Sequence, residues 1–182
     1  DTTACPTGLF CTDGVCCGLP TCGTGSSCSA GAKKGVCAKI NGSTCGSDLE
    51  CGSGHCADGV CCDGACAGQC DACVVAGSIG KCTPVAGAPH PPRTACTTDA
   101  KNVCASQVCD GTDTTKCAGF VGTSVACRPQ SCKDGVKTVA ASCTGAGKCP
   151  DVITTPCAGF ACNDTGKDCR TSCTTDAECI PE

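Results

Sequence analysis

Cys56-Ala-Asp-Gly-Val-Cys61-Cys62 decides the fold class of this chain, because it sets a tight turn between closely spaced cysteines. Asp-Gly favours a two-residue turn with positive φ, and the runs of residues between such turns are too short for stable helices. A Val- and Thr-rich piece such as residues 136–139 favours a short strand. We therefore predict a small disulfide-rich fold of tandem modules, built from short β-hairpins and turns, elongated and with little or no helix.

The same pattern of residues occurs 45 positions earlier, as Cys11-Thr-Asp-Gly-Val-Cys16-Cys17. Later cysteines align at this offset as well: Cys28 with Cys73, and Cys37 with Cys82. A fixed period of this size indicates a repeated structural unit. We divide the chain into a short module, 1–44, a second module, 45–95, and a third cysteine-rich region, 96–182. The Pro-rich residues 88–93 read as an extended connector, since consecutive prolines fix φ and lack amide donors.

The composition excludes a domain packed around large apolar side chains. Of the 182 residues only 23, about 13%, are Val, Ile, Leu or Phe, whereas 29 are Cys. Chains with less than roughly 20% of these apolar residues struggle to bury a core. We therefore expect no enzyme, and a scaffold held together by covalent crosslinks or by metal.

The cysteine spacing favours disulfides over metal. Thiolate clusters need close pairs of ligands, but the chain has no C-x-C and its single C-x-x-C is Cys70-Asp-Ala-Cys73. We expect no metal and no cofactor. Structural disulfides are expected at the cysteines of the two repeated modules: Cys16, Cys17, Cys22, Cys28, Cys37, Cys61, Cys62, Cys66, Cys70, Cys73 and Cys82.

Disulfide-rich chains fold in oxidising places, so we expect a secreted protein of the extracellular space or the cell surface. The chain has no Met, which suggests a mature polypeptide whose leader was removed or a segment of something longer. A net charge of −4 and the lack of any basic cluster argue against nucleic-acid binding. We see no apolar run long enough for membrane insertion.

The end of the chain resembles the opening of the second module. Residues 45–51 and residues 173–179 share the form C-x-x-D-x-E-C. The number of cysteines is odd, so at least one is a free thiol or bonds to something outside this sequence. We expect a joint between subunits near Cys5, Cys11, Cys173 and Cys179.

Residues 51–62, 66–73 and 75–85, with C-x-x-D-x-E-C at 173–179, resemble the tandem Cys-rich modules of large exported proteins in myxobacteria and related bacteria. The resemblance covers roughly residues 45–179 and implies export and placement at the cell surface, with no catalytic residues. Residues 5–28 also resemble the six-cysteine framework of inhibitor cystine knots. Spacing leaves both a knot and pairing of neighbouring cysteines open.

Other candidate sites have plainer explanations. His55 and His90 lack an adjacent nucleophile and orienting partner, so we expect them to be solvent-exposed bystanders. The carboxylates of residues 48, 50, 176 and 178 are too few per loop for a typical calcium site. Asn41 and Asn163 match glycosylation sequons, so glycans are possible partners.

These observations favour a structural subunit of a disulfide-stabilised extracellular filament, fibre or surface coat, assembling head to tail with copies of itself. The alternative is an adhesin, binding or spacer module of a large cell-surface protein. Binding hot spots favour Trp, Tyr and Arg. The chain has no Trp or Tyr and only three arginines, which ranks the alternative second.

Overall fold

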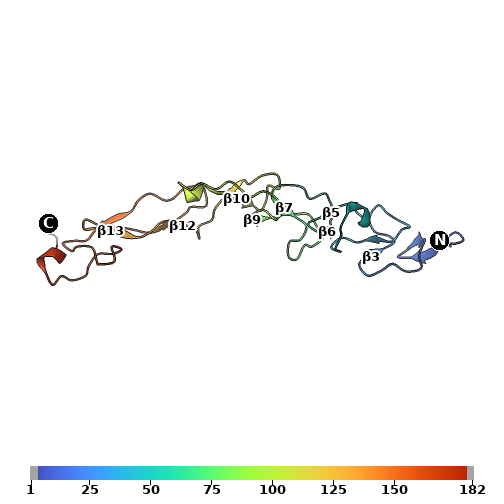
Figure 1. The fold of residues 1–182 in the computed structure, drawn as a ribbon, viewed down its shortest axis with the longest axis horizontal. Coiled ribbons are helices and arrows are strands. Elements are labelled where there is room, and N and C mark those ends of the chain that lie inside the picture. Colours follow the sequence, from blue (N-terminus) through green and yellow to red (C-terminus); the bar gives the residue numbers. More distant parts are fainter. Residues whose placement is uncertain (1–3, 180–182) are drawn as a thin grey trace. The chain divides into compact units, whose positions relative to one another are not determined.

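The computed structural model describes residues 4–179 and divides the chain into two compact units (Figure 1). Unit 1 comprises the residues up to Ala95 together with Cys109–Cys117. Unit 2 comprises Cys96–Val108 together with the residues from Ala118 onward. Residues 44 and 45, on either side of the first expected module boundary, both lie in unit 1.

Unit 1 is a series of short antiparallel strand pairs and one 3-10 turn. Each pair joins segments of two or three residues, so every sheet is small. The pairs are β1 (Phe10–Thr12) with β2 (Val15–Cys17), β3 (Ser26–Ser27) with β4 (Ala38–Lys39), β5 (Cys56–Ala57) with β6 (Val60–Cys61), β7 (Asp71–Ala72) with β8 (Thr83–Pro84), and β9 (Ala86–Gly87) with the end of β10 (Gln107–Asp110). The 3-10 turn is η1 (Asp48–Glu50).

Unit 2 has the same character. The start of β10 pairs with β11 (Gly119–Phe120), and β12 (Ala126–Arg128) pairs with β15 (Ala141–Ser142) through an irregular register. A three-stranded sheet has the order β13 (Ser131–Lys133), β14 (Val136–Thr138), β16 (Thr154–Pro156). Two 3-10 turns complete the unit, η2 (Val103–Ala105) and η3 (Asp176–Glu178).

The predicted fold class is confirmed: the protein is disulfide-rich, nearly free of helix and built from short antiparallel hairpins. The strand expected at residues 136–139 is β14. Within residues 4–179 the only helices are three-residue 3-10 turns, none with the length or apolarity to cross a bilayer.

The Asp-Gly pairs turn the chain where the sequence predicted. Asp13 and Gly14 link β1 to β2 with φ values of 53° and 77°, and Asp58 and Gly59 link β5 to β6 with 52° and 81°. Glycine adopts such a left-handed backbone without a Cβ clash, and aspartate tolerates it better than most residues. Two-residue hairpins of this type match the right-handed twist of strands, so they fix the register of each pair.

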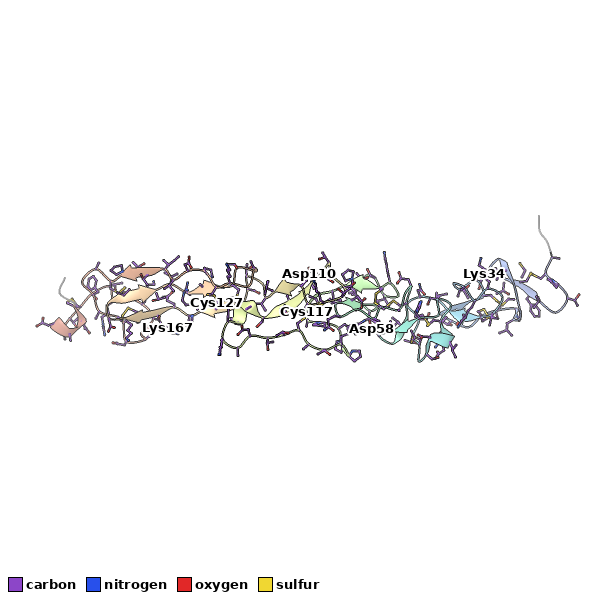
Figure 2. The ribbon with its side chains drawn as sticks, turned by 90° about the horizontal axis from the view of Figure 1, so that it is seen from above. Lys34, Asp58, Asp110, Cys117, Cys127 and Lys167 are labelled. Atoms are coloured by element: carbon purple, nitrogen blue, oxygen red, sulfur yellow. A yellow bond between two sulfur atoms is a disulfide. The ribbon has the colours of Figure 1, made fainter. Side chains whose placement is uncertain are left out.

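Sulfur replaces hydrocarbon in the interior. Every fully buried large side chain among the described residues is a cysteine: Cys17, Cys28, Cys51, Cys61, Cys62, Cys70, Cys73, Cys104 and Cys109. Many large apolar side chains lie outside instead, including Leu49 and Val36, which are 84% and 65% exposed. The cysteines of residues 4–179 form 14 disulfides, drawn as yellow bonds in Figure 2. Such bridges form and persist in an oxidising environment.

Candidate functional site

Each cysteine expected to be structural is disulfide-bonded. In the first module the pairs are Cys5–Cys16, Cys17–Cys28 and Cys22–Cys37. In the second they are Cys45–Cys56, Cys51–Cys61, Cys62–Cys73 and Cys66–Cys82, and Cys70 bonds to Cys109. Cys70 and Cys73 therefore have different partners and do not form a dithiol. Unit 2 contains Cys104–Cys143, Cys127–Cys149, Cys132–Cys162, Cys157–Cys169 and Cys173–Cys179.

The disulfides of the two modules coincide at the sequence offset. Cys17–Cys28 and Cys62–Cys73 lie 45 residues apart at both ends, and the other two pairs match within one residue. The turn aspartates match as well. Asp13 Oδ2 accepts the N–H of Cys28 at 2.9 Å, and Asp58 Oδ2 accepts the N–H of Cys73 at 2.7 Å. The N–H of Cys28, followed by the Ser27 hydroxyl, lowers the pKa of Asp13.

The six cysteines of residues 5–28 do not pair as a cystine knot, which is one of the two arrangements that their spacing left open. A six-cysteine knot needs three bridges inside that framework, but these residues contain only two, Cys5–Cys16 and Cys17–Cys28. Cys22 bonds outside the framework to Cys37, and Cys11 is free. Cys5–Cys16 and Cys17–Cys28 close successive loops, and Cys22–Cys37 closes a loop that overlaps the second of them.

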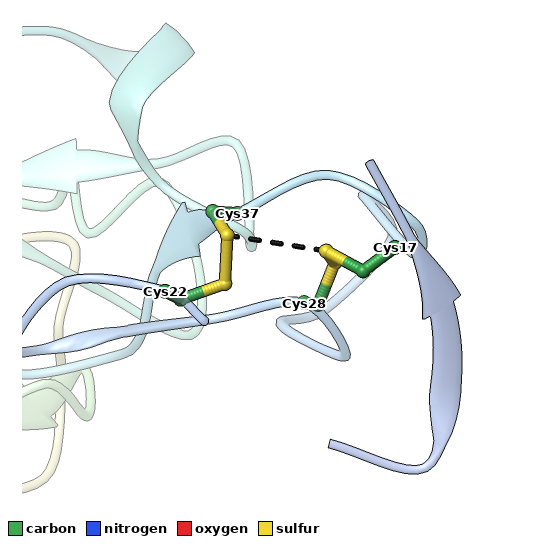
Figure 3. Close-up of side chains that lie close together, drawn as sticks. All are labelled: Cys17, Cys22, Cys28 and Cys37. Atoms are coloured by element: carbon green, nitrogen blue, oxygen red, sulfur yellow. Dashed lines mark hydrogen bonds between the residues drawn. A yellow bond between two sulfur atoms is a disulfide. The ribbon is translucent and has the colours of Figure 1, made fainter. Parts of the chain in front are cut away.

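Adjacent disulfides touch and form the packed centre of the first module (Figure 3). Cys17 Sγ lies 3.9 Å from Cys37 Sγ, and both sulfurs belong to disulfides, so the contact is packing without a shared proton. The sulfurs of Cys17, Cys22, Cys28 and Cys37 all lie within 4.8 Å of one another. Metal binding requires thiolates, and these sulfurs are oxidised.

The free thiol belongs to Cys11, in β1. Cys11 is exposed and lies opposite Cys16 in the hairpin register. The two residues before it, Leu9 and Phe10, are 42% and 46% exposed. An accessible thiol therefore adjoins two uncovered apolar side chains. The other cysteines expected at a joint bond within the chain, Cys5 to Cys16 and Cys173 to Cys179.

In the second module the residue equivalent to Cys11 is Cys56, and residues 42–51 bond to it and pack beside it. Cys56 bonds to Cys45, and its N–H donates to Asp48 Oδ1 at 2.6 Å. The backbone of Cys61 donates to Ser43 and accepts from Gly42, both at 2.8 Å. We call residues 42–51 the opening segment. It adds backbone pairing to the outer edge of β6 and covers the β5–β6 hairpin.

Residues 173–179 have the local structure of the opening segment. The flanking backbone angles agree, with φ and ψ of −156° and 158° before η1 and −135° and 157° before η3. Each turn is closed by its glutamate. Glu50 Oε1 accepts the N–H of Gly46 at 3.0 Å, and Glu178 Oε2 accepts the N–H of Thr174 at 2.7 Å.

Neighbouring cations and hydrogen-bond donors stabilise the charged carboxylates of Glu50 and Glu178. The Lys39 ammonium beside Glu50, followed by the N–H of Gly46, lowers the pKa of that carboxyl. The N–H and hydroxyl of Thr174 lower the pKa of Glu178, which also pairs with Arg170 at 3.1 Å. The carboxylates of Glu50 and Glu178 thus serve as acceptors within the protein.

A buried ion cluster in the second module was not foreseen from the sequence. Arg93 Nη1 donates to Asp58 Oδ1 at 2.7 Å and Nη2 donates to Asp71 Oδ1 at 3.1 Å. The same guanidinium donates to the carbonyls of Cys66 and Gly68 at 2.6 and 2.8 Å. The Pro-rich stretch that ends in Arg93 is therefore anchored against its own module and is not a free connector.

The cluster has electrostatic consequences. Burial alone raises the pKa of Asp58, but the hydrogen bond from Arg93, the N–H of Cys73 and the nearby positive charge together hold that pKa below its usual value. His90 Nδ1 lies 3.6 Å from Asp58 Oδ1. His55 and His90 are both half-buried, so the expectation that they are solvent-exposed is wrong.

A groove in unit 1 is lined by both polar and apolar residues. Its cavity of about 560 Å³ is lined by Ala30, Gly31, Lys39, Ile40, Asn41, Ser53 and Asp63. Asn41, one of the sequon asparagines, thus lies at a groove. The other, Asn163, accepts the hydroxyl of Thr165 at 2.7 Å through its side-chain oxygen.

No protein-family model, curated protein or solved structure matches this chain.

Proposed function

We propose that this protein is a structural subunit of a disulfide-stabilised extracellular filament, fibre or surface coat that assembles head to tail with copies of itself. The same proposal holds that the protein is secreted, that it is built from tandem repeats, and that these repeats are similar to the Cys-rich modules of exported bacterial proteins.

The observation that carries the proposal is that disulfide-bonded cysteines fill the interior of the protein. Every fully buried large side chain among residues 4–179 is a cysteine, and the disulfides recur throughout both units. Closing a loop of about 15 residues with a disulfide stabilises a fold by roughly 3 kcal/mol. A chain held in this way resists heat, drying and protease while it stays oxidised. These properties suit a load-bearing extracellular material.

The residues offer no support for catalysis. A nucleophile needs a base within hydrogen-bond reach and a group that orients the base. Among the described residues, no hydrogen bond or ion pair joins His55 or His90 to the free thiol of Cys11. A non-enzymatic role therefore belongs to the proposal.

Electron microscopy of the purified protein tests the assembly. We expect negatively stained samples prepared without reductant to contain filaments or extended oligomers that lengthen with protein concentration. The matched control is the same sample after reduction and alkylation, which should contain neither. Discrete, monodisperse monomers at every concentration would count against a filament subunit.

The adhesin or spacer alternative lacks the side chains that concentrate binding energy. Arg93, Arg128 and Arg170 all donate hydrogen bonds to groups of this same chain. Exposed aromatic residues are limited, among the described residues, to Phe10 and Phe120. Specific capture of a cell-surface glycan or protein by the monomer, without self-association, would favour the alternative.

A further inference from the structure

The tripeptide Asp-Gly-Val occurs three times in the chain, each time at the turn of a β-hairpin. It spans the turn from β1 to β2 at residues 13–15, from β5 to β6 at 58–60, and from β13 to β14 at 134–136. The φ values of the three aspartates are 53°, 52° and 51°, and those of the three glycines are 77°, 81° and 73°. The three turns are therefore matched in sequence and in φ.

Hydrogen bonds hold the aspartate carboxylates of the first two turns. Asp13 Oδ2 accepts the N–H of Cys28 at 2.9 Å. Asp58 accepts the N–H of Cys73 and the guanidinium of Arg93, both at 2.7 Å. Each carboxylate must break these bonds before it can approach the amide of the glycine that follows it.

The two other Asp-Gly pairs of the chain are held in a similar way. Asp63 Oδ1 accepts the N–H of Cys82 at 2.7 Å. Asp110 Oδ1 accepts the N–H of Thr112 at 2.8 Å, and the N–H of Gly111 donates to the carbonyl of Val85 at 3.0 Å.

Asp134, in the third matched turn, has no such partner. It is exposed, and its carboxylate has no hydrogen bond or ion pair with any described residue. The amide of Gly135 also donates no hydrogen bond within the described part of the chain. Cys149 stands 15 residues after Asp134, as Cys28 and Cys73 stand after their aspartates, but its N–H does not bond to Asp134. An uncommitted carboxyl group and an uncommitted amide are thus neighbours at this one turn.

We propose that Asp134–Gly135 is a modification site at which isoaspartate forms through a cyclic succinimide. The amide nitrogen of Gly135 attacks Cγ of the protonated Asp134 carboxyl. The N–Cγ bond forms, and the amide proton leaves with the carboxyl hydroxyl as one water. A second water then adds to the main-chain carbonyl carbon of Asp134 and breaks its bond to the Gly135 nitrogen, so that the chain runs through Cβ and Cγ. One water is lost and one is gained, so no oxidant or reductant is consumed.

The matched turns react more slowly because their carboxylates are already bound. Hydrogen bonds to a charged group are stronger than those between neutral groups. Breaking them before cyclisation should slow the reaction at Asp13 and Asp58 by about tenfold or more relative to Asp134. The N–H of Cys28 also lowers the pKa of Asp13. That carboxyl therefore stays ionised to lower pH, and an ionised carboxylate is a poorer electrophile than the acid.

Isoaspartate at this turn loosens the sheet of unit 2 without cutting the chain. β14 is the central strand between β13 and β16, and the carbonyl of Gly135 accepts the N–H of Cys157 at 2.8 Å. Turn length fixes the register of a hairpin, so an extra main-chain methylene displaces that carbonyl. The disulfides Cys132–Cys162 and Cys157–Cys169 still crosslink the region. The inference concerns a single chain and does not rest on the proposed assembly.

Peptide mapping of the aged, oxidised protein tests the site. The full chain is held at mildly acidic pH and raised temperature in heavy-oxygen water, and is then reduced, alkylated and digested. We expect isoaspartate and one solvent oxygen at Asp134, with about a tenth as much or less at Asp13 and Asp58. The control is the chain reduced and alkylated before ageing, in which the three Asp-Gly-Val sites should react at similar rates. Equal rates in the oxidised protein, or no isoaspartate at Asp134 when the reduced chain forms it, would overturn the proposal.

Asp134→Glu is the matched variant, since it keeps the charge but must close a larger and less favourable ring. It should abolish the modification, and an isomeric peptide that persists in this variant refutes the assignment to Asp134. Hydrogen exchange at the amide of Cys157 should become faster on ageing in the wild type and stay constant in Asp134→Glu. Unchanged exchange in isomerised wild-type protein would contradict the loosened hairpin. Intact mass before and after reduction confirms that both proteins have the same disulfides.

Discussion

Arg93 illustrates how single residues stabilise a protein that has little hydrocarbon to bury. Its guanidinium is 12% exposed, and the carboxylates of Asp58 and Asp71 are 3% and 9% exposed. The planar fork of arginine satisfies two carboxylates and two carbonyls at once, which a lysine ammonium does not reproduce. The cluster ties residues at the end of the Pro-rich stretch to the β5–β6 turn.

We predict that Arg93→Ala lowers the free energy of unfolding by about 3–5 kcal/mol, because it leaves two buried carboxylates without the guanidinium that balances their charge. The chain has no Trp or Tyr for fluorescence, so denaturant unfolding is best followed by amide hydrogen exchange with the disulfides intact. Lys116→Ala is the control. Its pair with Asp113 is long, 3.9 Å, and lies at the surface, so the change should be within about 0.5 kcal/mol. Equal effects of the two substitutions would contradict a stabilising role for the cluster.

Acid should weaken the same cluster. The pKa of Asp58 is lower in the folded protein than its usual value. The stabilisation is therefore complete above the unfolded pKa of about 3.9 and is lost as the pH falls through the folded value. Unfolding free energies measured across this acid range should fall with pH in the wild type. Arg93→Ala should show a flatter or inverted dependence, and an unchanged slope would argue against this assignment.

At the scale of elements, close backbone contact replaces side-chain packing. Gly80, at φ 87°, lies where an added Cβ would meet the backbone nitrogen of Gly42 at 2.3 Å. Gly42 belongs to the opening segment and donates its N–H to Cys61. A substitution at Gly80 therefore disturbs the edge pairing of β6.

We predict that Gly80→Ala destabilises the protein by about 2 kcal/mol more than Gly77→Ala, since overpacking of a filled site costs about 1–3 kcal/mol. Gly77 is the matched control, because its φ is 81° and an added Cβ there meets no atom within 4 Å. Both variants share the strain of a left-handed alanine, so the difference isolates the contact with Gly42. Hydrogen exchange at Cys61 and nearby amides should rise in Gly80→Ala alone, and equal stability of the two variants would refute the close approach.

At the scale of the whole molecule, stability depends on oxidation. Each disulfide typically contributes about 2–4 kcal/mol, whereas the net stability of a domain is only about 5–15 kcal/mol. Loss of several disulfides therefore costs more free energy than the net stability of a typical domain. The exposed Leu49 and Val36 show that apolar side chains do not supply an alternative core.

We predict that reduction and alkylation abolish amide protection throughout both units, while the oxidised protein keeps protection and resists protease after heating. Hydrogen exchange and limited proteolysis with and without reductant measure the two states. Hairpins that remain protected after complete reduction would show that the strands are stable without sulfur.

The residues alone determine the fold class, because its causes are local. A high cysteine content, few large apolar side chains and Asp-Gly at short intervals predict hairpins crosslinked by disulfides. The sequence period predicts which cysteines of the first two modules correspond, but not how they pair. The choice of Cys11 as the unpaired cysteine, the absence of a knot in residues 5–28 and the Arg93 cluster depend on which distant segments meet in space. Such contacts depend on the distances between sulfur atoms and on the pairing of buried charges. These join residues far apart in the sequence and are defined only in the folded chain.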